Sequence, residues 1–131
     1  MKKRVVNGIY FHGEVDDVFA YVKQYNIMAV PLLAGSGIRV KIIEGMALGK
    51  PVITTSVGIE GIECKNGSDV LIANTSVEFV EAIEKCINDP GFTKQLADNG
   101  RKFTEEHHDI DKITQNLIQF YNERIKAHTN E

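Results

Sequence analysis

The chain has 131 residues, of which 43% are hydrophobic and 25% are charged, and it holds only 3 prolines. This length and composition suit one compact domain with a moderate core, and they exclude a disordered or collagen-like chain. The formal net charge of −3 argues against a protein that neutralises the phosphates of nucleic acid, so no nucleic-acid partner is expected.

The cysteines and the N-terminal segment bear on where the protein works. Cys64 and Cys86 lie 22 positions apart without a CxxC motif, which is typical of reduced thiols in a cytoplasmic protein. The basic residues 2–4 are not followed by an apolar run, so no signal peptide is expected. No stretch approaches the ~18 apolar residues of a membrane helix, and we expect membrane contact only through a partner or a missing segment.

The first half of the chain alternates short apolar runs with helical patterns. A strand is predicted over residues 5–11, ending at His12-Gly13, and apolar residues at helical spacing then predict a helix over 15–25. Asp16 and Asp17 are interpreted as acids near the start of that helix. Strands covered on both faces are predicted over 27–32 and 51–55, with a helix over 38–48 between them and a shorter strand over 70–73.

The second half of the chain is predicted to be helical. Thr75 and Glu78 have the spacing of a capping box ahead of an amphipathic helix that residues 88–91 end. Helices over about 93–106 and 110–125 follow. We interpret His107-His108-Asp109 as the corner between these two helices, with Asp109 as an N-cap, in preference to a metal site.

The alternation of short strands and helices predicts an α/β fold: a Rossmann-like parallel sheet with flanking helices, forming a single domain over residues 1–131. An independent fold of this kind usually carries its ligand turn after the first strand, whereas the glycine turn here follows the second. We therefore expect the fold to be truncated at its N-terminal side.

The turn Ala34-Gly35-Ser36-Gly37 is the strongest candidate binding element. Glycines let a ligand approach the backbone, and the free amides and positive dipole end of the following helix favour an anion, most simply a diphosphate. Helical spacing places Lys41 and Glu44 on one face, where Lys41 extends the positive field and Glu44 accepts hydrogen bonds from two hydroxyls, such as those of a ribose. Ser36 precedes Glu44 by 8 residues, roughly 12 Å along a helix, near the far end of such a ligand.

Other interpretations of these residues stay open. Lys41 and Glu44 could form a surface ion pair behind a simple glycine-rich connector. Neither the dinucleotide fingerprint nor the P-loop pattern fits the stretch, because Val40 and Pro51 stand where those motifs need other residues. His12, at the end of a strand, suits a structural role as well as a contact to a base.

Residues 32–55, LLAGSGIRVKIIEGMALGKPVITT, resemble the signature of the group 1 (family 4) retaining glycosyltransferases, which have the GT-B fold. The segments YFHGEV at 10–15, GIEGI at 58–62 and NGSD at 66–69 are similar to flanking elements of that family. The resemblance extends over nearly the whole chain, but only over roughly the last three quarters of the family's C-terminal, nucleotide-sugar-binding domain. From this resemblance we expect the N-terminal acceptor domain to be absent from the chain, together with an early loop that supplies an Arg and a Lys to the diphosphate.

The resemblance implies a role for each candidate site residue. The backbone amides of Gly37, Ile38 and Arg39 receive the leaving diphosphate, Lys41 stabilises its charge, and Glu44 binds the ribose. Ser36 stands where the family has a carboxylate that contacts the transferred sugar. The resemblance also implies that Phe11, His12 and Gly13 line the pocket for the base of the nucleotide.

The implied activity is transfer of a hexosyl group, with retention, from a nucleotide-diphosphate sugar to a glycan or lipid-linked acceptor, as in polysaccharide biosynthesis. A UDP- or GDP-sugar is the expected donor, with no metal and no further cofactor. The expected partner is an acceptor domain or a separate acceptor-domain chain, and we expect this chain to be inactive alone. The alternative is a non-catalytic nucleotide-binding or assembly module with a GT-B half-fold. In either case exposed apolar surface would favour partner docking or a homodimer.

Overall fold

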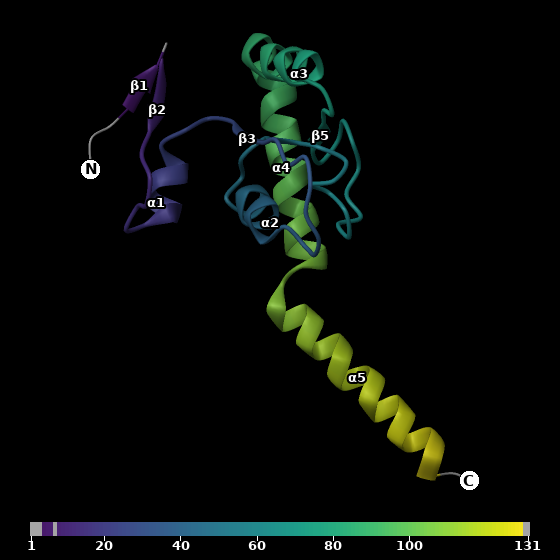
Figure 1. Cartoon of the computed structure of the whole chain (residues 1–131). Coiled ribbons are helices and arrows are strands. Elements are labelled where there is room, and N and C mark those ends of the chain that lie inside the picture. The colour runs from purple at the N-terminus through teal and green to yellow at the C-terminus, as the bar shows by residue number, and fades with distance from the viewer. Residues whose placement is uncertain (1–3, 7, 130–131) are drawn as a thin grey trace.

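The computed structural model describes residues 4–6 and 8–129 and is built around a three-stranded parallel sheet (Figure 1). The sheet has the order β3-β4-β5, formed by β3 (Met28–Val30), β4 (Val52–Thr54) and β5 (Leu71–Ile72). Register pairs Met28 with Val52 and Ile53 with Leu71. The predicted α/β architecture, a parallel sheet with flanking helices, is confirmed.

Helices cover both faces of this sheet. On one face Val52 packs with Ile42 and Met46 of α2 (Val40–Ala47), and on the other Ile53 packs with Cys86 of α3 (Ser76–Asn88). Helix α4 (Pro90–His107) contributes to both core clusters, because Phe103 joins the first and Leu96 the second. These two core clusters fix the position of the carboxyl end of the sheet, from which the chain enters α2.

The strands differ in how completely they are buried. Val52, Ile53 and Thr54 of β4 are all 0% exposed, which agrees with a strand covered on both faces. The same prediction for residues 27–32 is wrong in part, since Ala29 is exposed and β3 forms the edge of the described sheet. An apolar run without alternation thus identified the strand but not its edge position.

The N-terminal segment is a hairpin where a single strand was predicted over residues 5–11. β1 (Arg4–Val6) and β2 (Ile9–Phe11) pair antiparallel, with Val6 opposite Ile9. That register leaves two residues for the connection: Asn7, which lies outside the described residues, and Gly8, with φ of 83°. Asn-Gly is a favoured two-residue hairpin turn, so the sequence carried a signal that the strand prediction overlooked.

Helix α1 (Val18–Lys23) is shorter than the predicted helix over residues 15–25. Asp17 is its N-cap and accepts a hydrogen bond from the Ala20 amide at 2.9 Å, so the chain enters the helix after this residue. None of the residues of α1 is buried, and Phe19 is half exposed. Figure 1 shows β1, β2 and α1 to one side of the layers formed by β3–β5 and α2–α4.

The C-terminal helices follow the predicted order. The Thr75–Glu78 capping box at the start of α3 is complete, and Asp89 caps α4 through the Phe92 amide. Asp109 accepts hydrogen bonds from the Asp111 and Lys112 amides at the start of α5 (Ile110–Thr129), which confirms its role as a helix cap.

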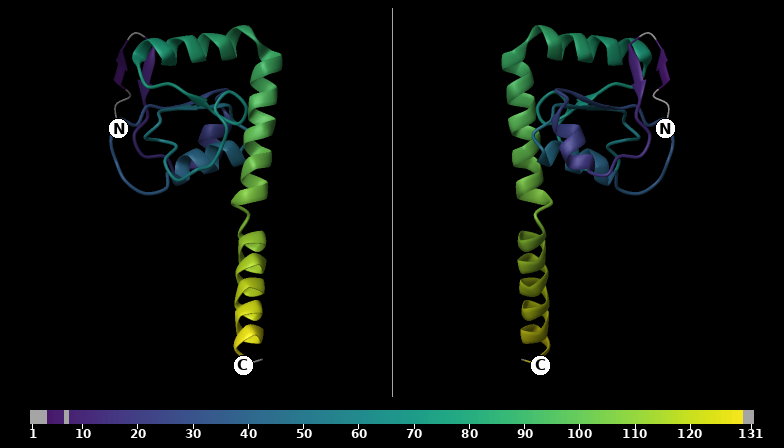
Figure 2. Two further views of the ribbon diagram at one scale, coloured as in Figure 1. Left: turned by 90° about the vertical axis from the view of Figure 1, so that its right-hand side faces the viewer. Right: turned by 90° about the vertical axis from the view of Figure 1, so that its left-hand side faces the viewer.

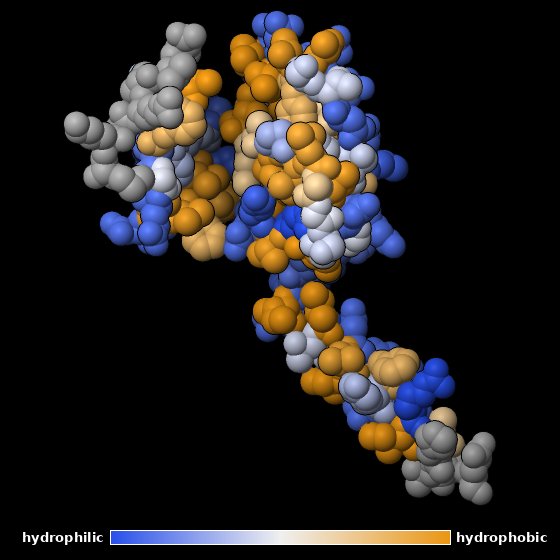
Figure 3. Space-filling model, in the orientation of Figure 1, coloured by the Kyte–Doolittle hydropathy of each residue, from blue (hydrophilic) through white to orange (hydrophobic). Residues whose placement is uncertain are grey.

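Helix α5 extends away from the sheet beyond the end of α4 (Figure 2). Ile110, Leu117 and Ile125 of α5 are more than half exposed. Orange, hydrophobic patches lie along this helix in Figure 3. No helix of the described part of the chain is both long enough and apolar enough to span a membrane.

Candidate functional site

The candidate site lies at the carboxyl end of the sheet, in the turn that joins β3 to α2. Two threonines from the end of β4 anchor the start of this turn. The Thr54 hydroxyl donates to the Val30 carbonyl at 2.9 Å, and the Thr55 hydroxyl donates to the Leu32 carbonyl. Both threonines are buried, so these hydrogen bonds fix the position of the backbone where the turn begins.

The glycine turn exposes a run of backbone amides. Gly35 and Gly37 have φ of 141° and 80°, values that side-chain-bearing residues rarely adopt. Within the described residues, the amides of Gly37, Ile38 and Arg39 donate no hydrogen bond, and the turn itself is exposed to solvent around Ser36. Unpaired amides followed directly by a helix form a suitable anion site.

The start of α2 differs from the starts of the other helices. α1 and α3 to α5 each have an Asp or Thr side chain that accepts hydrogen bonds from first-turn amides: Asp17, Thr75, Asp89 and Asp109. The N-cap of α2 is Arg39, which makes no side-chain cap hydrogen bond. In the described part of the chain, α2 is therefore the helix without a side-chain cap, and the unpaired amides of Gly37, Ile38 and Arg39 directly precede it.

The Arg39 side chain folds back beneath the turn, a feature that sequence reasoning missed. Its Nη1 donates to the Gly37 carbonyl at 2.8 Å and also to the Ser36 carbonyl. The spacing of a cation three residues after Ser36 could have suggested this contact, but sequence analysis used only the Arg39 amide. The guanidinium places a positive charge directly behind the exposed amides.

Lys41 and Glu44 lie on α2 and do not pair with each other. Lys41 is exposed and Glu44 is partly buried, and no ion pair or side-chain hydrogen bond of either is found among the described residues. The alternative of a surface ion pair is thus not formed in the structure. α2 begins at Val40, so Ser36 lies in an irregular turn and its separation from Glu44 does not follow the rise of a helix.

The three residues expected around a base lie apart from the glycine turn. Phe11 ends β2 and is 54% exposed, and Gly13 has φ of 69°. The His12 ring meets the Tyr21 ring edge-on, with centroids 5.0 Å apart. In Figure 1 this hairpin and α1 stand on the opposite side of β3 from the segment leading into α2. Among the described residues, no hydrogen bond, ion pair or ring contact joins these three residues to the glycine turn or to α2.

An apolar cavity of about 450 Å³ adjoins the start of the glycine turn. Pro31 and Leu33 of the turn form one side of it, and residues 74–76 with Phe79 of α3 form the other. Leu33 is 81% exposed at its rim. The carboxyl end of the sheet thus offers an amide-lined turn beside an apolar hollow.

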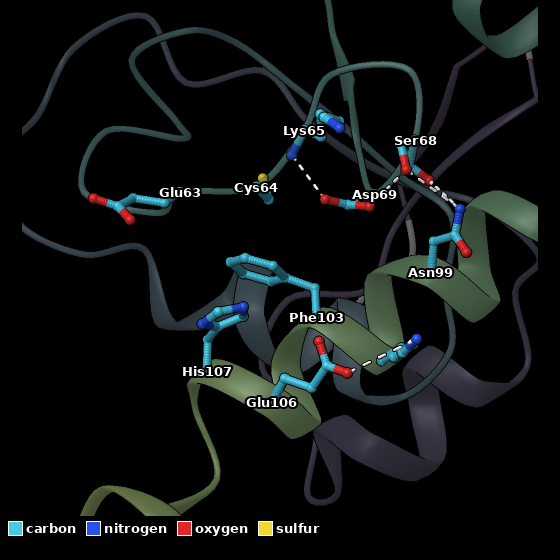
Figure 4. A pocket seen from close by; sticks show the side chains of 10 residues that line it. Glu63, Cys64, Lys65, Ser68, Asp69, Asn99, Phe103, Glu106 and His107 are labelled. Atoms are coloured by element: carbon cyan, nitrogen blue, oxygen red, sulfur yellow. Dashed lines mark hydrogen bonds and ion pairs between the residues drawn. The ribbon is translucent and has the colours of Figure 1, made fainter. Parts of the chain in front are cut away.

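A second, polar cavity of about 440 Å³ lies between the loop over residues 63–69 and α4 (Figure 4). None of the predicted site residues lines it. Some of its charged groups have partners: the Asp69 carboxylate accepts a hydrogen bond from the Lys65 backbone amide at 2.8 Å, and the Lys102 ammonium lies 3.8 Å from the Glu106 carboxylate. We interpret this cavity as structural, because the Asp69 carboxylate and the Lys102 ammonium, two of its charged groups, already have partners.

Neither cysteine is arranged for chemistry. Both are free thiols. Cys64 lines the polar cavity, where burial and then the nearby Asp69 carboxylate raise the pKa of its thiol to about 11. A thiol with that pKa is protonated near neutral pH and is a poor nucleophile. Among the described residues, no group of three or more His, Cys, Asp or Glu side chains could hold a metal ion.

Comparisons with known proteins identify relatives of this site. The family model for glycosyl transferases group 1 matches residues 1–89. An uncharacterised glycosyltransferase of Methanocaldococcus jannaschii is 32% identical over 93 residues, which cover 70% of this chain and 26% of that protein. An uncharacterised 44.6 kDa protein in the cps region of Klebsiella pneumoniae is 29% identical over 89 residues, covering 68% of this chain and 23% of that protein.

The fold has a counterpart among solved structures. The sucrose-phosphate synthase of Thermosynechococcus elongatus, a GT-B enzyme, superposes with a TM-score of 0.67 at 25% identity, covering 82% of this chain and 27% of the synthase. The chain spans about a quarter of the length of the curated relatives it matches. The family match includes the glycine turn, α2 and Glu44.

Proposed function

The chain belongs to the group 1 glycosyl transferases, and from this premise we propose that it forms the donor-binding part of a hexosyltransferase of the retaining, family 4 type. The donor is a nucleotide-diphosphate sugar, with UDP- or GDP-sugars as the first candidates. The acceptor is a glycan or a lipid-linked glycan. One relative is named for its place in the cps region, which supports a role in polysaccharide synthesis.

The uncapped start of α2 is the observation that carries this proposal. The amides of Gly37, Ile38 and Arg39 lack acceptors within the described residues, while the other helices use an Asp or Thr side chain at this place. A diphosphate supplies acceptor oxygens and negative charge together, which is what unpaired amides and a helix dipole favour. The Arg39 guanidinium behind the turn strengthens the same field.

Glu44 binds the ribose in this proposal. It lies one helical turn beyond Lys41 on α2 and is partly buried, and its carboxylate has no hydrogen-bond partner among the described residues. An ionised carboxylate has only acceptors, so it is suited to the two adjacent hydroxyls of a ribose. A partly buried carboxylate without a protein partner is costly, and a ligand with hydroxyl donors would relieve that cost.

Transfer would proceed by stabilisation of the leaving group. As the bond between the sugar and the diphosphate breaks, negative charge grows on the phosphate oxygens, and the turn amides with Lys41 are preorganised to stabilise it. The exposed Ser36 hydroxyl is the side chain of the turn proposed to contact the transferred sugar. Retention is proposed without a protein nucleophile, and neither a metal nor a further cofactor is part of the scheme.

The base and the acceptor need further elements. We propose that Phe11, His12 and Gly13 wall the base, which requires the hairpin and the glycine turn to approach each other when nucleotide binds. Because the chain spans about a quarter of the length of its relatives, we assign acceptor binding to a further domain or to a partner chain. Exposed apolar residues such as Leu33 and Ile38 beside the turn favour such a partner, or a second copy, at this edge.

Calorimetric titration with UDP and GDP tests the proposed site. We predict that Glu44→Ala weakens binding at least tenfold, because two hydrogen bonds to a charged acceptor are each worth about 1.5–3 kcal/mol. Glu63→Ala is the matched control, since it removes the same charge from an exposed residue that lines the polar cavity. Equal losses in the two variants would show a general charge effect and would remove Glu44 from the site.

A further inference from the structure

We propose that Arg39 is a positioning residue, whose guanidinium fixes the Gly37 and Ile38 amides as an outward-facing pair of donors. The inference deepens the proposed function and rests on it for the identity of the ligand, a diphosphate. The family resemblance implies a role only for the backbone amide of Arg39. The structure adds a role for its side chain that acts through the turn and not by touching the ligand.

Two hydrogen bonds define how the side chain holds the turn. Nη1 of Arg39 donates to the carbonyls of two successive residues, Ser36 and Gly37, the latter at 2.8 Å. A trans peptide unit is planar, with its C=O and its N–H pointing in opposite directions. The described peptide bonds include no cis bond. A carbonyl of Ser36 that points to the guanidinium therefore turns the Gly37 amide away from it, and the Gly37 carbonyl does the same for the Ile38 amide.

The backbone of the turn is shaped around this guanidinium. A Cβ atom on Gly35 would lie 2.4 Å from Nη2 and 3.1 Å from Cζ of Arg39, so a side chain at this position would displace the guanidinium. The φ of 141° at Gly35 and of 80° at Gly37 complete a path that glycine adopts readily. The glycine at position 35 is thus explained by the arginine beneath the turn, whereas at position 37 the positive φ is the reason for glycine.

Two of the three guanidinium nitrogens are closed off from solvent. Nε and Nη2 of Arg39 are buried and have no partner among the described residues. Two unsatisfied donors are unfavourable for a side chain whose only task is packing. The guanidinium charge lies on the carbonyl side of these two peptide units, opposite the Gly37 and Ile38 amides. It therefore attracts an anion without occupying the exposed side where the anion would bind.

Titration of the full 131-residue chain with UDP and with inorganic pyrophosphate tests the ligand part of the inference. We expect Arg39→Ala to bind both about tenfold more weakly, and Arg39→Lys, which keeps the charge but lacks the rigid fork, to remain closer to the alanine variant than to the wild type. Arg101→Ala is the control, because the Arg101 side chain is exposed and pairs with Glu105 on α4, away from the glycine turn. Wild-type affinity in the lysine variant would show that charge alone suffices and would overturn the positioning role.

Backbone ¹⁵N relaxation on the free chain tests the hold on the turn independently of any ligand. We expect the order parameters of the Gly37 and Ile38 amides to fall from the range of rigid backbone, about 0.85, to below about 0.6 in both Arg39 variants, while that of Met46 in α2 stays unchanged. Unchanged values at Gly37 and Ile38 would overturn the inference. If the wild type binds neither probe, the proposed function fails, and the relaxation result still decides whether Arg39 orders the turn.

Discussion

Gly58→Ala tests whether the loop after β4 packs as closely as the structure indicates against Thr54, which anchors the turn of the candidate site. Gly58 is buried, and its amide donates to the Thr55 hydroxyl at 3.0 Å. A Cβ atom there would lie 2.1 Å from Oγ1 of Thr54 and 3.3 Å from Cδ1 of Ile42. The Thr54 hydroxyl cannot move aside freely, because it is fully buried and donates to the Val30 carbonyl.

The expected cost of Gly58→Ala combines two effects. Overpacking a filled site costs about 1–3 kcal/mol, and a displaced hydroxyl that leaves a buried group unpaired adds about 1 kcal/mol. We therefore predict a loss of about 2–4 kcal/mol in the free energy of unfolding. For a chain of this length the loss corresponds to a fall of about 10 °C in Tm.

Urea denaturation followed by circular dichroism measures this cost, and a double-mutant cycle locates its source. In a Thr54→Ala background the clashing hydroxyl is gone, so Gly58→Ala should cost at least about 1 kcal/mol less than it does in the wild type. A loss below about 0.5 kcal/mol in the wild-type background would refute the close approach. The same cost in both backgrounds would refute Thr54 as its cause.

Two further predictions concern the C-terminal helices. Gly100→Ala should destabilise the chain by about 1 kcal/mol, because a Cβ atom would lie 2.8 Å from the Asp69 carbonyl oxygen. This cost outweighs the better helix propensity of alanine. Gly91→Ala, near the start of α4, meets no atom closer than 3.4 Å and should be neutral or slightly stabilising. Thermal denaturation of both variants checks this pair, and equal effects would contradict it. Hydrogen bonds from the Asn74 and Thr75 amides lower the pKa of the Glu78 carboxyl group in the folded chain. The ionised carboxylate therefore stabilises the fold at pH values above the usual pKa of a glutamate. This stabilisation is lost as the pH falls through the lowered pKa of the folded chain. Denaturation curves of Glu78→Gln should therefore lose less stability than the wild type on acidification in that range, and identical pH profiles would contradict this assignment.

Features with local causes were predictable from the sequence. The capping box of Thr75 and Glu78 and the cap at Asp109 depend on residues three positions apart or fewer, and both form as expected. The burial of β4 followed from an apolar run that could not be a membrane span or a long helix. The glycine turn before α2 was predictable because glycine disfavours the interior of a strand or helix and readily adopts the positive φ of a tight turn.

Features that depend on the surroundings were not predictable in the same way. The exposure of Ala29 reflects the position of β3 at a sheet edge, which no pattern within residues 27–32 encodes. The apolar stripe of α5 predicted a helix but not that this face would be exposed. The hold of Arg39 on two carbonyls arises from side-chain conformation, which a motif gives only as a residue type.

A crystal structure of the chain with bound UDP tests the central claim most directly. The account predicts diphosphate oxygens within hydrogen-bonding distance, about 3 Å, of the Gly37 and Ile38 amides, and ribose hydroxyls on the Glu44 carboxylate. Nucleotide bound instead in the polar cavity beside Glu63 and His107, with the start of α2 empty, would contradict it.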